Sequence, residues 1–96
     1  MKQKWLVNMT REELIEVFAG NIKRQRKLLH LTQVDVAQRA GITQAYLSAL
    51  ESGTAQPALG TLAPLAGALE TTPSSLLDAQ LYFLARRPEL QQHAAS

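Results

Sequence analysis

The stretch 41-GITQAYLSALESG-53 decides how this chain folds. Thr43 can cap a helix that ends before Gly53. At 100° per residue, Tyr46, Leu47 and Leu50 fall on one side of that helix, and we expect this side to face the core. The opposite side carries only small or uncharged polar residues, namely Gln44, Ala45, Ser48, Ala49 and Ser52. The stretch therefore predicts a short helix with one buried side and one neutral, exposed side.

A second short helix precedes this one. Thr32 can cap a helix over residues 33–39, and Asp35 lies near the positive end of its dipole. Gly41 can end that helix in the left-handed conformation. Two short helices joined by residues 40–43 form a helix-turn-helix.

The rest of the chain also shows helical patterns. Thr10 and Glu13 form a capping box, and the apolar stripe that follows reaches about Leu29. Gly20 interrupts the stripe, which leaves two alternatives: one long helix, or a break near the glycine. No segment alternates apolar and polar residues as a strand would. We therefore predict an all-α fold.

Prolines place the later helices. For the fourth helix we favour a start capped by Thr61 over a start at Leu59, because Pro64 then lies in the first turn, where a proline needs no amide partner. Thr72 and the proline after it predict a last helix over residues 73–86.

Composition limits the class of protein. A chain of 96 residues with 46% hydrophobic and 19% charged residues fits one small globular domain. The absence of cysteine excludes disulfides and thiolate zinc sites. The apolar run from Trp5 to Val7 is too short for a signal peptide, and no run approaches the roughly 18 apolar residues of a membrane span. We therefore expect a cytoplasmic protein without a membrane partner.

Positive charge is concentrated in the middle of the chain. The net charge is +2, whereas residues 18–57 carry five basic and two acidic side chains. Four of the five basic side chains lie within residues 23–27. Such a cluster either solvates a helix surface or binds phosphate groups.

The motif and its spacing resemble a known family. Residues 22–77 are similar to the DNA-binding domains of the lambda and 434 repressor and Cro family, also called the XRE family. The matching positions are Ile22, Arg26, Leu31, Gln33, Val36, Ala37, Gly41, Ile42, Thr43, Gln44, Leu47, Leu50, Glu51, Gly53, Pro57, Leu62, Ala66, Leu69, Leu76 and Leu77. The resemblance implies a five-helix, repressor-like helix-turn-helix bundle with an N-terminal extension. Its parts would be the extension at 1–17, the DNA-binding domain at 18–77, and a C-terminal dimerisation helix and tail at 78–96.

The same resemblance assigns roles to single residues. The third helix would lie in the major groove of double-stranded DNA, with base contacts from Gln44, Ala45 and Ser48. Phosphate contacts that position the protein would come from Gln33, Thr43, Lys23, Arg24, Lys27, Arg39 and Tyr46. Tyr46 alternatively belongs to the core. Arg26 and Glu51 would form an ion pair, so that the only charge of the opening stretch need not face DNA.

The last helix is expected to meet a partner surface. Residues 76–85 leave almost no polar side, whereas a surface helix needs only one apolar stripe. Proteins of this family usually bind a near-palindromic operator as homodimers. The helix would then supply the dimer interface through Leu77, Leu81, Tyr82, Phe83 and Leu84, aided by the segment around Trp5. Deeper burial within one domain is the alternative.

The chain also departs from the family pattern. His30 stands where the family commonly has glycine, so we expect the first helix to end differently. Thr54, Ala55 and Gln56 replace residues that are often basic, which argues against phosphate contacts after the third helix.

No pattern in the sequence indicates an enzyme. His30 and His93 are the only histidines, and the adjacent Glu12 and Glu13 diverge on a helix. We therefore expect no catalytic residues, no metal and no cofactor. A sequence-specific transcription regulator of the repressor type is the expected function. The alternative is an antitoxin-type or other interaction module that binds a partner protein such as a toxin, with DNA binding secondary or lost.

Overall fold

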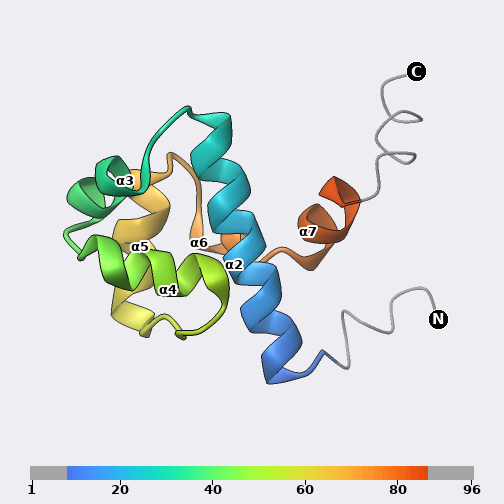
Figure 1. The fold of residues 1–96 in the computed structure, drawn as a ribbon. Coiled ribbons are helices and arrows are strands. Elements are labelled where there is room, and N and C mark those ends of the chain that lie inside the picture. Colours follow the sequence, from blue (N-terminus) through green and yellow to red (C-terminus); the bar gives the residue numbers. More distant parts are fainter. Residues whose placement is uncertain (1–8, 87–96) are drawn as a thin grey trace, which may run out of the picture.

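Six helices and no strand make up residues 9–86, the part of the chain that the computed structural model describes (Figure 1). In chain order they are α2 (Arg11–Leu28), α3 (Gln33–Ala40), α4 (Gln44–Ser52), α5 (Leu59–Ala68), α6 (Pro73–Leu76) and α7 (Ala79–Ala85). The predicted all-α class is confirmed. None of these helices is long and apolar enough to cross a bilayer.

The core lies between α2 and the four helices from α3 to α6. Phe18 and Ile22 of α2, Leu47 and Leu50 of α4, and Leu65 of α5 are at most 1% exposed. They belong to one hydrophobic cluster that also receives side chains from α3 and α6. In Figure 1, α3, α4 and α5 lie on one side of α2, and α7 lies on the other.

The first helix is continuous through Gly20. Thr10 accepts a hydrogen bond from the Glu13 amide at 3.1 Å, and the Glu13 carboxylate accepts one from the Thr10 amide at 2.8 Å, which completes the predicted capping box. Of the two alternatives, the single long helix is confirmed. Residues 11–17, placed by the sequence in an N-terminal extension, share this helix with the helix-turn-helix region.

Gly20 has a packing role that its helix propensity does not show. A Cβ atom built on Gly20 would lie 2.3 Å from Cε1 of Tyr82, so the tyrosine ring occupies the space that any larger residue would fill. Tyr82 of α7 is 5% exposed, and its hydroxyl donates a hydrogen bond to Glu16 at 2.6 Å. Burial raises the pKa of the Tyr82 phenol, and the bond to Glu16 raises it further. α7 therefore docks on α2 at the one position of this helix that lacks a side chain.

The predicted last helix over residues 73–86 is wrong, because the structure divides it into α6 and α7. The amide nitrogen of the buried Asn21 donates to the carbonyls of Leu76 and Asp78, both at 3.0 Å. These carbonyls are thereby satisfied by a side chain of α2 instead of by the next turn of helix. Asp78 then caps α7 by accepting from the Leu81 amide at 3.1 Å.

The favoured start of the fourth helix at Thr61 is also wrong. α5 begins at Leu59 after Ala58, which offers no side-chain cap, and Pro64 lies inside the helix. Pro64 cannot donate to the carbonyl of Gly60, but Gly60 is exposed, so water can satisfy that carbonyl. Burial of the α5 leucines against the core outweighs the local proline signal.

The end of the first helix corrects a third expectation. His30 has a φ of 58°, the left-handed conformation that a glycine at this position would adopt. The Leu31 amide bonds to the Arg26 carbonyl at 3.1 Å, as in a glycine-terminated helix. The helix therefore ends in the usual way, with histidine in place of glycine.

Gly20→Ala should lower the free energy of unfolding by about 1–3 kcal/mol, because the new methyl group displaces Tyr82 and with it α7. Urea unfolding measures this change, and hydrogen exchange of the α7 amides locates it. Gly67→Ala is the matched control: Gly67 is also helical, has no atom within 4 Å of a built Cβ, and should gain about 0.5–1 kcal/mol. Equal gains for both variants would contradict the packing role of Gly20.

Candidate nucleic-acid interface

α3 and α4 form the predicted helix-turn-helix. Gly41 between them has a φ of 73°, which a residue with a side chain adopts only with strain. The amide of Ile42 bonds to the carbonyl of Ala37 at 3.0 Å, which closes the end of α3. Thr43 then caps α4 by accepting from the Tyr46 amide at 3.0 Å. The turn is thus built from local bonds that the sequence pattern predicts.

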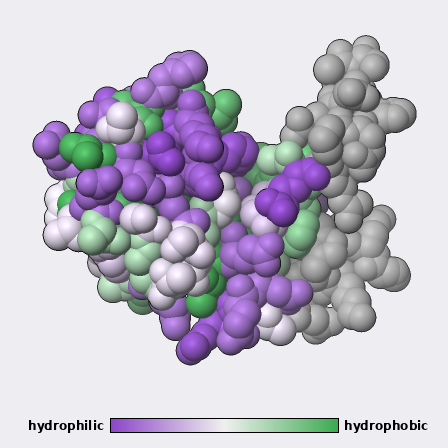
Figure 2. Space-filling model, viewed as in Figure 1, coloured by the Kyte–Doolittle hydropathy of each residue, from purple (hydrophilic) through white to green (hydrophobic). Residues whose placement is uncertain are grey.

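The first two turns of α4 present a neutral surface. Gln44, Ala45 and Ser48 are exposed, whereas Leu47 and Leu50 on the other side are completely buried. Figure 2 shows near-neutral residues over α4 and hydrophilic residues over the C-terminal half of α2. The exposed side chains of α4 are short, so the helix can come into close contact with a flat or grooved partner.

A buried ion pair holds α4 against α2. Arg26 Nε and Nη2 donate to the two carboxylate oxygens of Glu51 at 2.7 and 2.9 Å. The side chains are only 13% and 4% exposed. This fork-to-fork geometry is the strongest form of a charge-assisted hydrogen bond. The hydrogen bond with Glu51 raises the pKa of Arg26, against the opposing effect of burial.

The ion pair also organises the segment before α3. A third nitrogen of Arg26, Nη1, donates to the carbonyl of Leu31 at 3.0 Å. Gln33, the first residue of α3, donates from Nε2 to Glu51 at 3.2 Å. Gln33 was predicted as a phosphate contact, and the structure places its amide nitrogen inside this network. Its side chain therefore joins the N-terminus of α3 to the C-terminal end of α4.

The structure supports the core alternative for Tyr46. The ring is half-buried against the core, and the hydroxyl donates to the carbonyl of Gln56 at 3.4 Å. The tyrosine therefore ties α4 to the loop that follows it.

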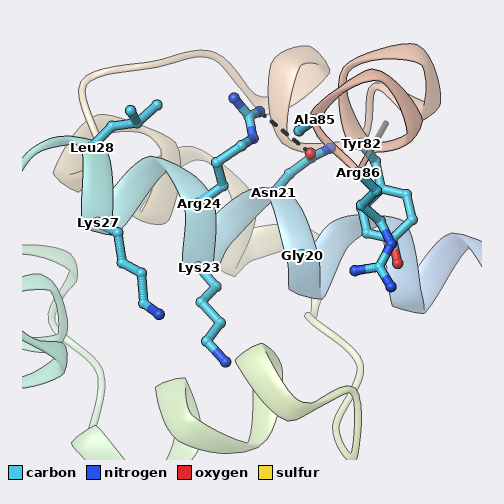
Figure 3. A pocket seen from close by; sticks show the side chains of 9 residues that line it. All are labelled: Gly20, Asn21, Lys23, Arg24, Lys27, Leu28, Tyr82, Ala85 and Arg86. Carbon is cyan, nitrogen blue, oxygen red and sulfur yellow. Dashed lines mark hydrogen bonds between the residues drawn. The ribbon is translucent and has the colours of Figure 1, made fainter. Parts of the chain in front are cut away.

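The predicted phosphate-binding cations do not share one surface. Arg39 donates to the Ala68 carbonyl at 3.3 Å and to Glu70 at 3.4 Å, at the end of α5. Lys23 and Lys27 point together to one side of α2, whereas Arg24 points toward the α7 side (Figure 3). Arg24 Nη2 donates to Asn21 at 3.4 Å, and its buried Nε has no partner. Lys23 and Lys27 are thus the pair of this set that stays together and exposed.

The residues predicted for a dimer interface also separate. Leu77 is half-buried against the main core, and Tyr82 is buried against α2, so neither offers its full side chain to a partner. Leu81 and Phe83 are half-buried, and the Phe83 ring stands edge-on to Tyr82 with centroids 5.0 Å apart. Leu84 is 41% exposed. Trp5 lies outside the described residues.

Two residues that position α7 were missed by the sequence analysis. Asn21 and Gly20 decide where α7 lies, although no sequence motif includes Asn21 and Gly20 was expected only to interrupt the apolar stripe. Their partners are more than fifty positions away along the chain, so no local pattern reveals them. Residues 9–86 contain no group of three acidic or histidine side chains that could hold a metal.

Glu51→Ala should lower the free energy of unfolding by about 3–5 kcal/mol, because it leaves the Arg26 guanidinium buried and unpaired. Thermal melting followed by circular dichroism measures the loss. Glu70→Ala is the control, since it removes the exposed ion pair with Arg39 and should cost about 1 kcal/mol or less. Similar melting of the two variants would show that burial of the Arg26 pair carries no special weight.

Known proteins share both the motif and the fold. The model of the helix-turn-helix family HTH_3 matches residues 22–76. The immunity repressor protein of Bacillus phage phi105 is 39% identical over 56 residues, which are 58% of this chain and 39% of the repressor. The uncharacterized HTH-type transcriptional regulator y4dJ of Sinorhizobium fredii is 40% identical over 57 residues, which are 59% of this chain and 74% of that protein.

A solved structure agrees with these matches. The restriction-modification controller protein C.AhdI from Aeromonas hydrophila superimposes with a TM-score of 0.63 and 26% identity, over 65% of this chain and 94% of that one. The chain therefore belongs to the HTH_3 helix-turn-helix family of DNA-binding transcription regulators.

Proposed function

We propose that this chain is a dimeric, operator-specific regulator that acts by occupying its DNA site and not by chemistry. The observation that carries the proposal is the exposed neutral start of α4, held in a fixed position by the buried pair of Arg26 and Glu51. A helix held in this way can enter the major groove with its N-terminal residues toward the bases.

Base recognition would come from the first turns of α4. The Gln44 side-chain amide can bond N6 and N7 of one adenine, and the methyl group of Ala45 can contact a thymine methyl. Ser48 can donate to or accept from a base. Because none of these residues is charged, attraction to DNA must come from elsewhere, and the exposed Lys23 and Lys27 are suited to it.

The relatives support a regulatory role of this kind. One is a phage immunity repressor, and a structural neighbour is a controller protein of a restriction-modification system. The chain spans only 39% of the length of the phage repressor, so only that part of the repressor is comparable. A dimer would use α7, whose Leu81 is half-buried and whose Leu84 is 41% exposed.

Selection of bound duplexes from random DNA, at a stated salt concentration, tests the proposal as a whole. We expect enrichment of a two-fold symmetric site with half-sites about 34–36 Å apart, because each α4 of a dimer reads one half. A pool without any enriched sequence would contradict the proposal and favour a protein-binding role for the neutral face of α4.

Gln44→Ala should remove discrimination at one base pair of each half-site. The expected loss is about 1–3 kcal/mol against the preferred base, with the salt dependence of binding unchanged, because no phosphate contact is lost. Titration of matched and single-mismatch duplexes by fluorescence anisotropy measures both quantities. Gln80→Ala, an exposed glutamine of α7, is the control and should bind as the unmodified chain does. Equal specificity in the two variants would remove Gln44 from base recognition.

A further inference from the structure

A hollow between α2 and α7, called the basic hollow here, collects positive charge (Figure 3). Its volume is about 460 Å³, and its lining includes Lys23, Arg24 and Lys27 of α2 and Arg86 of α7 but no acidic residue. Within residues 9–86, none of these four cations pairs with an acidic side chain. Because the net charge of the whole chain is only +2, the rest of the chain is on balance acidic. Attraction to a polyanion therefore has to come mainly from this hollow.

The rest of the lining is largely apolar. Leu28 of α2 and Tyr82 and Ala85 of α7 provide walls of low polarity beside the charged groups. A cleft lined by charges of one sign and by such walls focuses the electric field and concentrates counterions. Like charges around one hollow also repel each other, so an anion from outside the chain is needed to balance them. For a DNA-binding regulator, the anion that fits is the phosphate backbone of DNA.

Arg86 is held in place at the edge of the basic hollow. Its guanidinium carbon lies 5.2 Å from the centroid of the Tyr82 ring, a cation–π contact. Tyr82 is in turn fixed on α2, because its ring packs on Gly20 and its hydroxyl donates to Glu16. Docking of α7 therefore brings one exposed cation to a defined position on the surface of α2.

The basic hollow continues toward the C-terminal end of α4. A neighbouring hollow of about 420 Å³ is lined by Lys23 and Arg86 together with Ser52 and Gly53. α4 is about 13 Å long, and the major groove of DNA is about 12 Å wide. When Gln44 at the start of α4 reaches the bases, Ser52 at its end therefore lies near the edge of the groove, where the phosphate backbone runs. The cations beside Ser52 then lie next to that backbone.

We propose that Arg86 contacts the phosphate backbone of bound DNA together with Lys23 and Lys27, so that α7 is part of the DNA-binding surface. The inference rests on the proposed function and names a further residue that touches the DNA. Such a contact strengthens binding and fixes the orientation of the protein without reading sequence.

Two other features of α2 and α7 agree with this path of the backbone. Glu12 and Glu16 line the neighbouring hollow and repel phosphates, which confines the backbone to the C-terminal half of α2. On α7, Leu84 lies about 160° around the helix from Arg86. The side of α7 that carries Leu84 therefore stays available to a second copy while Arg86 binds DNA.

The salt dependence of DNA binding tests the proposal. Fluorescence anisotropy with random-sequence duplexes, between about 50 and 200 mM salt, gives the slope of log affinity against log salt. Arg86→Gln should reduce this slope by about 0.9 per bound copy, so that the loss of affinity over this salt range becomes about 3- to 4-fold smaller. Arg86→Lys keeps the charge and should keep the slope. Lys27→Gln combined with Arg86→Gln should reduce the slope by about 1.8, because two phosphate contacts are lost.

Arg11→Gln is the matched control. It removes the same charge from an exposed residue in the first turn of α2, outside both hollows, and should leave the slope unchanged. Melting temperatures of the two exposed-site variants should match that of the unmodified chain. If Arg86→Gln and Arg11→Gln give the same slope, α7 is not part of the DNA-binding surface, while an operator enriched from random DNA still supports the proposed function. An unmodified chain that binds no duplex at 50 mM salt overturns both proposals.

Discussion

The buried pair of Arg26 and Glu51 is the interaction on which the rest of the structure depends. The Arg26 guanidinium donates to both carboxylate oxygens of Glu51 and to the carbonyl of Leu31 in the loop before α3. Gln33 adds a further hydrogen bond to Glu51. Three helices meet at this point, so the angle of α4 on α2 is set by directional bonds as well as by leucine packing. Directional bonds matter here because α4 is only 9 residues long, and a helix of this length is not stable without tertiary contacts. The exposed side of α4 carries no charge, because the only charged residue of the helix, Glu51, binds Arg26 inside the protein.

α2 serves two different partners on its two sides. Toward α3, α4 and α5 it contributes Phe18, Ile22 and Arg26, which build the helix-turn-helix domain. On its other side Gly20 and Asn21 receive α7, one by the absence of a side chain and the other by bonding carbonyls that the broken helix leaves free. The domain therefore couples the position of α7 to the same helix that positions α4.

Sequence signals for helix caps and turns predicted the structure correctly where hydrogen bonds between residues close in the chain form the feature. The caps at Thr10, Thr32, Thr43 and Thr72 all accept the predicted amide hydrogen bonds, and Gly41 takes the left-handed turn. The same signals failed where packing opposed them. Pro64 lies inside α5 because leucine burial outweighs one lost backbone bond, and His30 adopts the conformation expected of glycine because the chain must turn there to begin α3. In the candidate site, exposure of Gln44, Ala45 and Ser48 follows from helical periodicity, whereas the dispersal of Arg24 and Arg39 to other surfaces does not.

The sequence by itself determined the all-α class, the helix-turn-helix, and which side of α4 is exposed, because caps and apolar spacing act over three or four residues. Its resemblance to repressor domains supplied the pair of Arg26 and Glu51. Only the tertiary structure decided that Gln33 joins this pair, that the last predicted helix breaks at Asp78, and that the Tyr82 ring packs on Gly20. These features depend on residues brought together from distant parts of the chain. Their partners are chosen by the packing of whole helices, which no short stretch of sequence records.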